Sequence, residues 1–259
     1  MSVITSRHHP LVKQCRAILR GDDERLLLDG WHLVSEALAA GLPMAWVAVD
    51  AGRSTADRRV LDRAAAAGAR VVQVTDAVLQ AMSPVRSASG VVAVCERPDV
   101  DSRALLAPAP SLVLTALGVQ DPGNVGALVR SADAAGATGV LLDAPAADPW
   151  SWKALRASMG SSFRLPVCRE ETAVDHLGAW QRDGVRVIAA DAHDGVPMYD
   201  LALEGSLAIV LGGEGAGLPA RVLEMADARV RVPMRPRVES LNVAVAAALL
   251  LYEAARQRA

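Results

Sequence analysis

Short apolar stretches alternate with amphipathic ones over the first hundred residues of the chain. Stretches of strand length with apolar residues predict β-strands, and apolar residues at helical spacing predict α-helices between them. The strands are expected at residues 25–28, 45–49, 69–74 and 90–95. The helices are expected at residues 10–19, 32–40, 56–67 and 75–82. This order predicts a small α/β sandwich.

The second half of the chain repeats the alternation, but its strands are almost continuously apolar. Strands are expected at residues 111–116, 139–142, 166–168, 185–190, 207–211 and 228–232. Helices are expected at residues 124–135, 151–157, 172–183, 219–225 and 241–256. Continuous apolar strands between helices favour a parallel sheet that is covered on both faces.

A proline-rich stretch with little periodicity separates the two halves. Residues 98–110 read PDVDSRALLAPAP and contain three prolines. We therefore expect an N-terminal domain over residues 1–97, a linker over 98–110 and a larger α/β domain over 111–259.

Composition narrows the class of protein further. The chain has 259 residues, and its longest apolar run, 243–252, is shorter than the roughly 18 residues that span a bilayer. The N-terminus lacks the apolar stretch of a secretory signal, so a cytoplasmic protein without membrane contact is expected. Cys15, Cys95 and Cys168 lie far apart and form no CxxC pair. Neither a disulfide framework nor a metal site is expected.

The net charge of −2 does not by itself indicate nucleic-acid binding, but basic residues are unevenly distributed. Residues 1–97 contain 12 Lys+Arg and 10 Asp+Glu, whereas residues 98–259 contain 15 and 19. The first 20 residues include Arg7, Lys13, Arg16 and Arg20 and no acidic residue. Contacts with a polyanion are therefore expected mainly in the N-terminal part.

The first motif with chemical potential, GVQDPGNVGALVR, extends from Gly118 to Arg130. It follows a predicted strand and opens a helix. Asn124 stands where a helix N-cap belongs, and capping is its plain structural role. Arg130 lies off the apolar face of the helix and would be a solvated arginine on pattern alone. The motif is neither a Walker loop nor a GxGxxG fingerprint.

The second motif, LAIVLGGEGAGLP, extends from Leu207 to Pro219 and places four glycines within six positions directly after a strand. Glycines allow the backbone to approach a ligand closely or to adopt positive φ. A glycine loop at the carboxyl end of a strand is where open α/β sheets bind ligands. A tight turn is the alternative, but it needs fewer glycines. The carboxylate of Glu214 suits a ligand that is cationic or donates hydrogen bonds.

The third motif, VPMRPRVESLN, extends from Val232 to Asn242 and leads into an apolar helix. Ser240 and Asn242 stand at the start of that helix, and capping by Ser240 is the plain structural alternative. Arg235 and Arg237 are expected either in solvent or in contact with phosphate.

Together and in this order, the three motifs resemble the signatures of the SpoU/TrmH branch of the SPOUT superfamily, which contains RNA 2′-O-ribose methyltransferases. The stretch SMGSSFRLP, between the first and second motifs, also resembles a family element. The resemblance covers residues 111–259 well. It extends more weakly to the N-terminal part, where SRHHPLVKQCRAIL, LLLDGWHLVSEAL and ASGVVAVCE resemble a small RNA-binding domain of the ribosomal-protein (L30e-like) type.

The resemblance implies a fold, a cofactor and a set of site residues. The C-terminal α/β domain would contain a deep trefoil knot whose loops hold S-adenosylmethionine without a metal ion, and the protein would be a homodimer with each site completed across the interface. By matching positions, the residues in contact with the cofactor would be Leu211, Gly212, Gly213, Gly217, Val232, Met234 and Leu241. The functional polar residues would be Asn124, Arg130, Glu214, Ser240 and Asn242.

Three positions depart from the usual family pattern. Many relatives have Asn where this chain has Gly213, and Gly where it has Pro236. Glu239 precedes Ser240, a variation like that of the thiopeptide-resistance rRNA methyltransferases. These departures concern the substrate and the cofactor geometry rather than the class of reaction.

A ribose 2′-OH must lose its proton as it attacks the sulfonium methyl group, and no histidine lies in the three motifs. The family assigns the role of base to the arginine that matches Arg130, assisted by a substrate phosphate. A guanidinium group keeps its proton at any pH below its pKa, which is about 12 or higher. We therefore interpret Arg130 as a residue that binds the phosphate and stabilises the developing alkoxide. Asn124 and Ser240 would orient the ribose and Arg130, and Glu214 would fix its loop or balance charge.

Several alternatives remain open at this stage. Large-subunit (23S) rRNA is the preferred substrate, because the N-terminal part resembles that of rRNA-modifying relatives, and tRNA is second. A non-catalytic RNA-binding or ribosome-assembly protein could keep the same fold. A Rossmann-type oxidoreductase would need the glycine fingerprint that this chain lacks. Apolar residues spread around the helix 241–256 also predict a second packing partner, as expected for a homodimer.

Overall fold

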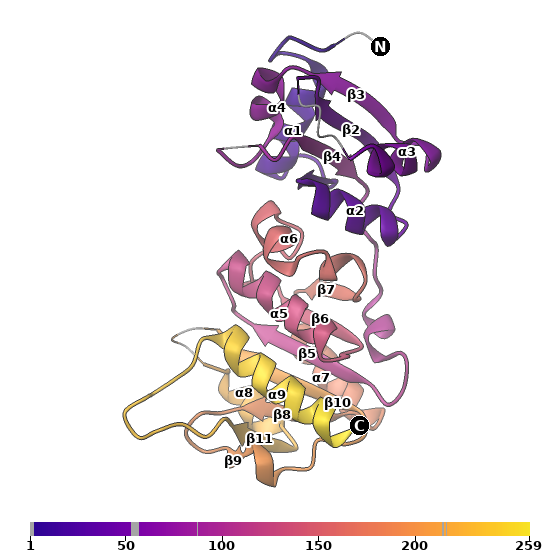
Figure 1. Ribbon diagram of the computed structural model, residues 1–259. Coiled ribbons are helices and arrows are strands. Elements are labelled where there is room, and N and C mark those ends of the chain that lie inside the picture. Colours follow the sequence, from indigo (N-terminus) through magenta and orange to yellow (C-terminus); the bar gives the residue numbers. More distant parts are fainter. Residues whose placement is uncertain (1–2, 53–56, 87, 214, 216) are drawn as a thin grey trace. The chain divides into compact units, whose positions relative to one another are not determined.

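The computed structural model describes residues 3–52, 57–86, 88–213, 215 and 217–259. The chain divides into two compact units (Figure 1). The first consists of Met1–Asp99 together with Trp150–Phe163, and the second of Val100–Pro149 and Arg164–Ala259. The segment 150–163 thus belongs to the first unit, although it follows the first motif in the sequence.

The first unit contains a four-stranded sheet in the order β1-β4-β2-β3, with β1 at Leu26–Asp29, β2 at Met44–Asp50, β3 at Arg70–Val74 and β4 at Val91–Cys95. Strand β4 pairs antiparallel with β1 and β2, whereas β2 and β3 are parallel. The helices are α1 at Pro10–Arg20, α2 at Trp31–Ala39, α3 at Arg58–Ala66 and α4 at Asp76–Met82. Each predicted element of this half is present, with ends shifted by one or two residues.

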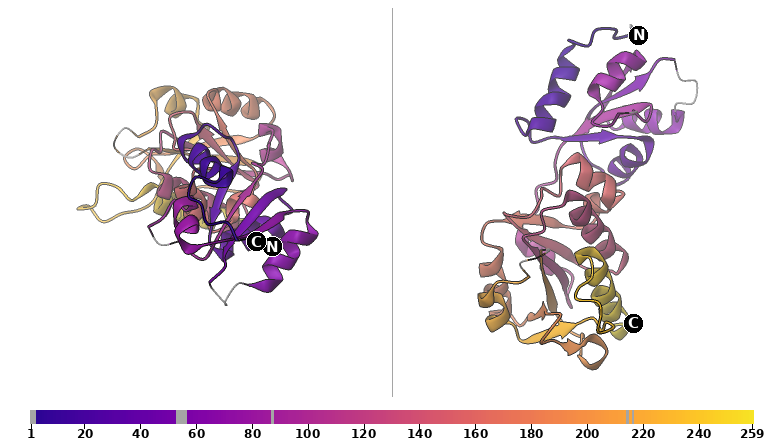
Figure 2. Two further views of the ribbon diagram at one scale, coloured as in Figure 1. Left: turned by 90° about the horizontal axis from the view of Figure 1, so that it is seen from above. Right: turned by 90° about the vertical axis from the view of Figure 1, so that its left-hand side faces the viewer.

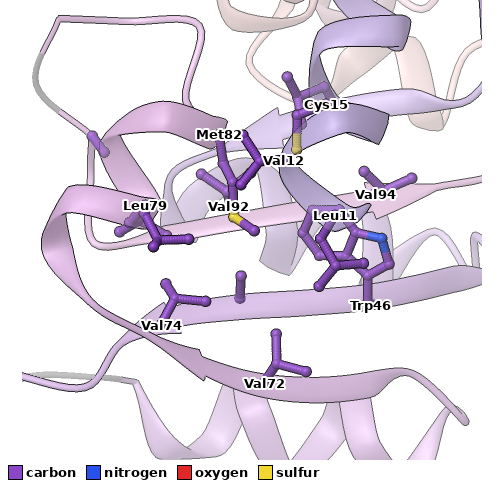
Figure 3. Close-up of a cluster of buried hydrophobic side chains, with 14 residues drawn as sticks. Leu11, Val12, Cys15, Trp46, Val72, Val74, Leu79, Met82, Val92 and Val94 are labelled. Carbon is purple, nitrogen blue, oxygen red and sulfur yellow. The ribbon is translucent and has the colours of Figure 1, made fainter. Parts of the chain in front are cut away.

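The core of the first unit lies between α1, α4 and one face of the sheet (Figure 3). Val12 and Cys15 of α1 and Met82 of α4 pack against side chains of the sheet such as Val92 and Trp46. All three cysteines of the chain are buried, and each is a thiol outside any disulfide. Burial raises the pKa of the Cys15 thiol to about 12, which makes it unreactive.

The second unit is built around a seven-stranded sheet in the order β7-β6-β5-β10-β8-β11-β9. All of its strand pairs are parallel, as the continuous apolar strands predicted. The strands are β5 at Leu112–Leu117, β6 at Gly139–Asp143, β7 at Val167–Glu170, β8 at Arg186–Ala190, β9 at Val196–Pro197, β10 at Leu207–Gly212 and β11 at Ala228–Arg231. The short strand β9 was not predicted from the sequence.

Helices cover both faces of this sheet (Figure 2). They are α5 at Pro122–Ala134, α7 at Ala173–Arg182, α8 at Ala220–Met225 and α9 at Val243–Gln257. Leu177 of α7 and Val222 of α8 share a core with Val113, Val187 and Val210 of the sheet. Helices α5 and α9 pack against each other and against β6 and β10, respectively.

Part of the segment predicted as a linker packs closely on the second unit. Residues Ser102–Leu106 form the 3₁₀ helix η1, and Leu105 is fully buried. The hydroxyl of Thr138 donates a hydrogen bond to the carbonyl oxygen of Leu105 at 2.6 Å. Gly139 at the start of β6 lies so close that an added Cβ would be 2.5 Å from a methyl carbon of Leu105.

Candidate active site

The carboxyl ends of β5, β10, β8 and β11 lie at one edge of the sheet, because all these strands are parallel. The loops that follow these four strands surround two pockets, which share Gly213 and Gly217. The pocket at the end of β5, here called the motif 1 pocket, has a volume of about 350 Å³. The larger one, here called the glycine-loop pocket, has a volume of about 730 Å³. The larger volume is within the usual range for a cofactor or small-molecule site.

The glycine-loop pocket brings together the second and third motifs. Its lining includes every residue that the sequence predicted for cofactor contact: Leu211, Gly212, Gly213, Gly217, Val232, Met234 and Leu241. Ser240 and Glu239 also line it. The apolar part of its wall comes from Leu218, Leu223, Val243, Ala246 and Leu250. It is thus a largely aliphatic pocket with polar groups at selected points.

The backbone is so tightly packed at Gly212 and Gly213 that side chains have no space. A Cβ at Gly213 would lie 2.2 Å from the carbonyl oxygen of Gly118, and one at Gly212 would lie 2.2 Å from the carbonyl carbon of Gly217. Gly213 also pairs with Gly217 in an antiparallel bridge. Gly213 stands where many relatives have asparagine. A glycine suits this position because the neighbouring loop at Gly118 leaves no space for a side chain. The close packing also leaves main-chain groups as the wall of the pocket.

The glycine-loop pocket has a polar side that the sequence analysis missed. Asp191 and His193, in the loop after β8, line it together with Ala190 and Ala192. The backbone N–H groups of His193 and Asp194 donate to Asp191 Oδ1 at 3.0 and 3.2 Å. No glycine-rich pattern marks this loop. Its place at the end of a predicted parallel strand was the signal that could have found it.

The carboxylate of Asp191 is held in its ionised form. Partial burial acts to raise its pKa, but the two backbone hydrogen bonds and the positive charge of Arg229 outweigh that effect and lower the pKa below the ordinary value. A guanidinium nitrogen of Arg229 lies 3.7 Å from Asp191 Oδ2. The pocket therefore offers a negative charge and a hydrogen-bond acceptor to a ligand.

The motif 1 pocket is lined by residues between Leu117 and Asn124 and by the two shared glycines. Asn124 is not the N-cap of α5, which corrects the structural role expected for it. The helix begins at Pro122, and the side chain of Asp121 caps it by accepting a hydrogen bond from the Asn124 N–H at 2.8 Å. Proline at the first helical position explains the earlier start, since it loses no hydrogen bond there.

Asn242, rather than Ser240, caps the last helix, which corrects a second expectation. Its side-chain oxygen accepts hydrogen bonds from the N–H groups of Ala244 and Val245. Its Nδ2 donates to Asn124 Oδ1 at 3.0 Å. The first and third motifs are therefore joined by a direct side-chain contact. Ser240 is exposed and available to a ligand in the glycine-loop pocket.

Arg130 is not placed in either pocket. Arg130 is exposed on α5, lines neither pocket, and forms no hydrogen bond or ion pair with any described residue. Glu214 lies outside the described residues, so its predicted role has no structural account here. The structure thus places Asn124 and Ser240 at the pockets and joins Asn242 to Asn124. It leaves the Arg130 guanidinium free to meet another molecule.

Two further classes of site find no support. In the described part of the chain, His, Cys, Asp and Glu side chains do not gather in groups of three or more that could hold a metal ion. Within the same residues, each helix is too short or too polar to cross a membrane.

Comparison with known proteins agrees with the motifs and with the fold. Residues 111–252 match the SpoU rRNA Methylase family, and residues 11–93 match the MRM3-like substrate binding domain. The 23S rRNA (guanosine(2553)-2′-O)-methyltransferase RlmP of Bacillus subtilis is 36% identical over 87% of this chain and 86% of its own length. A protein of Synechocystis that is named an uncharacterized tRNA/rRNA methyltransferase is 35% identical over 98% of this chain and 94% of its own length.

Solved structures of similar proteins superpose along nearly the whole chain. An rRNA methyltransferase from Sinorhizobium meliloti with bound AdoMet gives a TM-score of 0.87 at 30% identity and covers 98% of this chain and 97% of its own. The SpoU methyltransferase AviRb from Streptomyces viridochromogenes, in complex with the cofactor AdoMet, gives a TM-score of 0.84 at 29% identity over 96% and 98%. With its motifs, sheet order and relatives in agreement, this chain belongs to the SpoU rRNA methylase family.

Proposed function

We propose that this protein transfers a methyl group from S-adenosylmethionine to a ribose 2′-OH of RNA, with 23S rRNA as the preferred substrate. The observation that carries the proposal is the arrangement of the two pockets. The second and third motifs form one pocket and the first motif forms the other, and the pockets share Gly213 and Gly217. Transfer between two substrates requires such neighbouring sites.

The glycine-loop pocket fits S-adenosylmethionine. Its aliphatic wall suits the adenine ring of the cofactor. The main-chain groups around Gly212 can form hydrogen bonds with the edge of that ring. Ionised Asp191 would accept hydrogen bonds from ribose hydroxyls or the ammonium group of the cofactor. When bound, S-adenosylmethionine supplies a methyl group on a positively charged sulfur. The residues that would hold it are those predicted from the sequence, with Asp191 in addition.

The motif 1 pocket would hold the acceptor ribose. Asn124 lines this pocket, and its hydrogen bond to Asn242 fixes the orientation of its amide. A fixed amide can align the 2′-OH with the methyl group, which is where positioning contributes most to such a reaction. Ser240 would orient the ribose or Arg130 from the glycine-loop side. Arg130 would grip the adjacent phosphate and stabilise the charge that develops on the attacking oxygen, whose proton would pass to that phosphate or to water.

The same proposal includes a homodimer. Val245, Leu249 and Tyr252 lie on one face of α9 and are 48%, 39% and 55% exposed. Their spacing of four and three residues makes a continuous apolar stripe, which is costly to leave in water. Helix α9 packs on α5, so a dimer formed through this stripe would also bring α5, with Arg130, close to the partner. That arrangement agrees with the family pattern in which the partner completes each site.

Two finer features of the fold are also proposed rather than observed. A trefoil knot is supported by two observations. Strand β10 lies between β5 and β8 in the sheet. The third motif lines the same pocket as the glycine loop, and α9, which follows this motif, packs on β10. For the first unit, an L30e-like fold is supported by its four-stranded mixed sheet with α1 and α4 on one face. An enzyme of this kind would act in the cytoplasm, where ribosomes are assembled.

The decisive experiment maps 2′-O-methylation across total RNA from cells with and without the gene. We expect one site in 23S rRNA to lose its methyl group. If a methyl group is lost from tRNA instead, the substrate is tRNA, which is the second candidate. No lost site, together with no binding of S-adenosylhomocysteine, would favour a non-catalytic RNA-binding protein. A thermal-shift comparison of S-adenosylhomocysteine with NADH separates a methyltransferase from an oxidoreductase.

A further inference from the structure

Helix α6, Trp152–Ser158, belongs to the first unit even though the chain enters it from β6 and leaves it toward β7. Ala154, Leu155 and Ser158 are buried, and the helix packs on β1. Ser151 caps its start by accepting a hydrogen bond from the Ala154 N–H. One face of the helix is thus used for packing and the other is left for solvent.

The solvent face of α6 combines aromatic, cationic and thioether side chains. Trp152, Arg156 and Met159 follow one another at i, i+4 and i+7, so they lie in one row. Lys153 is exposed beside them. The Lys153 ammonium lies 5.7 Å and the Arg156 guanidinium 6.0 Å from the centroid of the Trp152 ring.

A further cation lies close to the start of the helix. Arg97, which follows β4, lies 5.5 Å from the ring centroid of Trp150, directly before the helix. Residues 150–163 contain two cations and no acidic residue. Lys153 and Arg156 form no ion pair with any described residue. Lys153 and Arg156 are therefore held over an aromatic ring and are not neutralised by a described carboxylate.

Met159 adds an independent observation. Among the described residues, Met159 is the one non-glycine residue with a positive φ. Its φ of 52° lies in the left-handed region. A glycine would adopt this conformation without strain, but this chain has a long side chain there that is 41% exposed. The Met159 carbonyl oxygen lies 3.2 Å from His32 Nε2 of α2, which holds the strained turn in place. Strain that is kept in this way is typical of positions with a function.

We propose that Arg97, Trp152, Lys153, Arg156 and Met159, the α6 surface, bind a single-stranded segment of RNA outside the methyl-transfer site. Cations held over an aromatic ring are oriented for phosphate oxygens, and Trp and Arg planes stack on unpaired bases. Met159 offers a polarizable surface for a neighbouring base. The inference rests on the proposed function, because it assumes an RNA substrate, and it assigns to that RNA a contact that none of the three motifs supplies.

The test measures binding of a fluorescent single-stranded adenylate 20-mer by anisotropy at several salt concentrations. The double variant Lys153→Ala/Arg156→Ala should lower the slope of log K against log salt by about 1.4, which corresponds to two lost phosphate contacts on a single strand. Trp152→Leu should weaken binding by about fivefold or more through lost stacking. Met159→Gly should weaken binding while the melting temperature stays the same or rises, since the strain is relieved.

The matched control is Arg58→Ala/Arg59→Ala, which removes two exposed cations from α3 of the same unit. Its salt slope should remain close to that of the wild type. An unchanged slope in the α6 double variant, or an equal change in the control, would overturn the assignment. Titration with S-adenosylhomocysteine separates the two proposals: all variants should bind it normally, whereas a wild-type protein that does not bind it contradicts the proposed function itself.

Discussion

Asn242 and Asn124 are 118 residues apart in the sequence, yet the Nδ2 of Asn242 donates a hydrogen bond to the Oδ1 of Asn124 at 3.0 Å. The same Asn242 side chain caps α9 through its oxygen. One residue therefore fixes the start of the last helix and also the amide at the motif 1 pocket. Its two roles use different atoms, so they can be separated by substitution.

Asn242→Asp should keep the helix cap and lose the contact with Asn124. The carboxylate can still accept from the N–H groups of Ala244 and Val245, but it has no donor for the Asn124 oxygen. We expect a melting temperature near that of the wild type and a turnover at least about tenfold lower, because the acceptor ribose is no longer aligned. Asn242→Ala should lose turnover and, in addition, about 1 kcal/mol of stability through the missing cap. Equal turnover in wild type and Asn242→Asp would show that the contact is only structural.

Gly213→Ala tests the tight packing of the glycine loop. The added methyl group would meet the Gly118 carbonyl at 2.2 Å, and backbone cannot move aside as a side chain can. Overpacking of this kind costs about 1–3 kcal/mol, and displacement of the loop should weaken S-adenosylhomocysteine at least about tenfold. Gly136→Ala is the control for backbone strain without crowding, because Gly136, unlike Gly213, has a positive φ and has open space around its Cβ position. It should cost about 1 kcal/mol and leave the affinity unchanged.

Stability at acid pH should depend on Glu253, near the end of α9. Hydrogen bonds from the side chains of Arg256 and Gln257 lower its pKa to about 2, against an ordinary value of 4.5. A lowered folded-state pKa means that its stabilising effect is complete above about pH 4.5 and disappears as the pH falls toward 2. Glu253→Gln should therefore have a lower melting temperature than the wild type at pH 7, and the difference should shrink between pH 5 and pH 2. A constant difference across that range would contradict the assignment.

The apolar stripe on α9 predicts that a charge at Tyr252 blocks dimer formation. Tyr252→Glu should shift the protein to a monomer in light scattering at micromolar concentration, because an unpaired charge at an apolar interface must be desolvated. Val196→Glu is a suitable control, since Val196 is also exposed but lies on β9, away from the stripe. If the wild type is itself a stable monomer, the proposed dimer is wrong. The proposed approach of Arg130 to a partner subunit is then wrong as well.

The sequence predicted the sheet of the second unit and the edge at which both pockets lie, because both follow from local patterns. Apolar runs mark parallel strands, and parallel strands place the ends of β5 and β10 together. It could not predict β9, since two residues carry no periodicity and its partner β11 is more than thirty residues further along the chain. The caps of α5 and α9 were misplaced because several polar residues stand at each helix start, and only the backbone path decides among them. The packing of α6 in the first unit depends on residues distant in sequence, such as those of β1.

Arg130 provides the sharpest test of the proposed chemistry, because its structural contribution is small. It is exposed on α5 and forms no hydrogen bond or ion pair with a described residue. Arg130→Ala should therefore leave the melting temperature almost unchanged. Affinity for S-adenosylhomocysteine should also be unchanged, since Arg130 lines neither pocket. If the guanidinium stabilises the reacting oxygen and its phosphate, the rate of methyl transfer should fall by a factor of at least ~100.

Arg130→Lys distinguishes a general charge effect from a fitted phosphate grip. Lysine keeps the positive charge but lacks the planar fork that binds two phosphate oxygens together, so only partial rescue is expected. The measurement is single-turnover methyl transfer to the mapped RNA, with cofactor titration and thermal melting on the same preparations. Full activity in Arg130→Ala would remove Arg130 from the mechanism, whereas a lost melting transition would reveal a structural residue. A slow, well-folded Arg130→Ala that binds the cofactor normally, with Arg130→Lys between it and the wild type, is the result that the free guanidinium on α5 predicts.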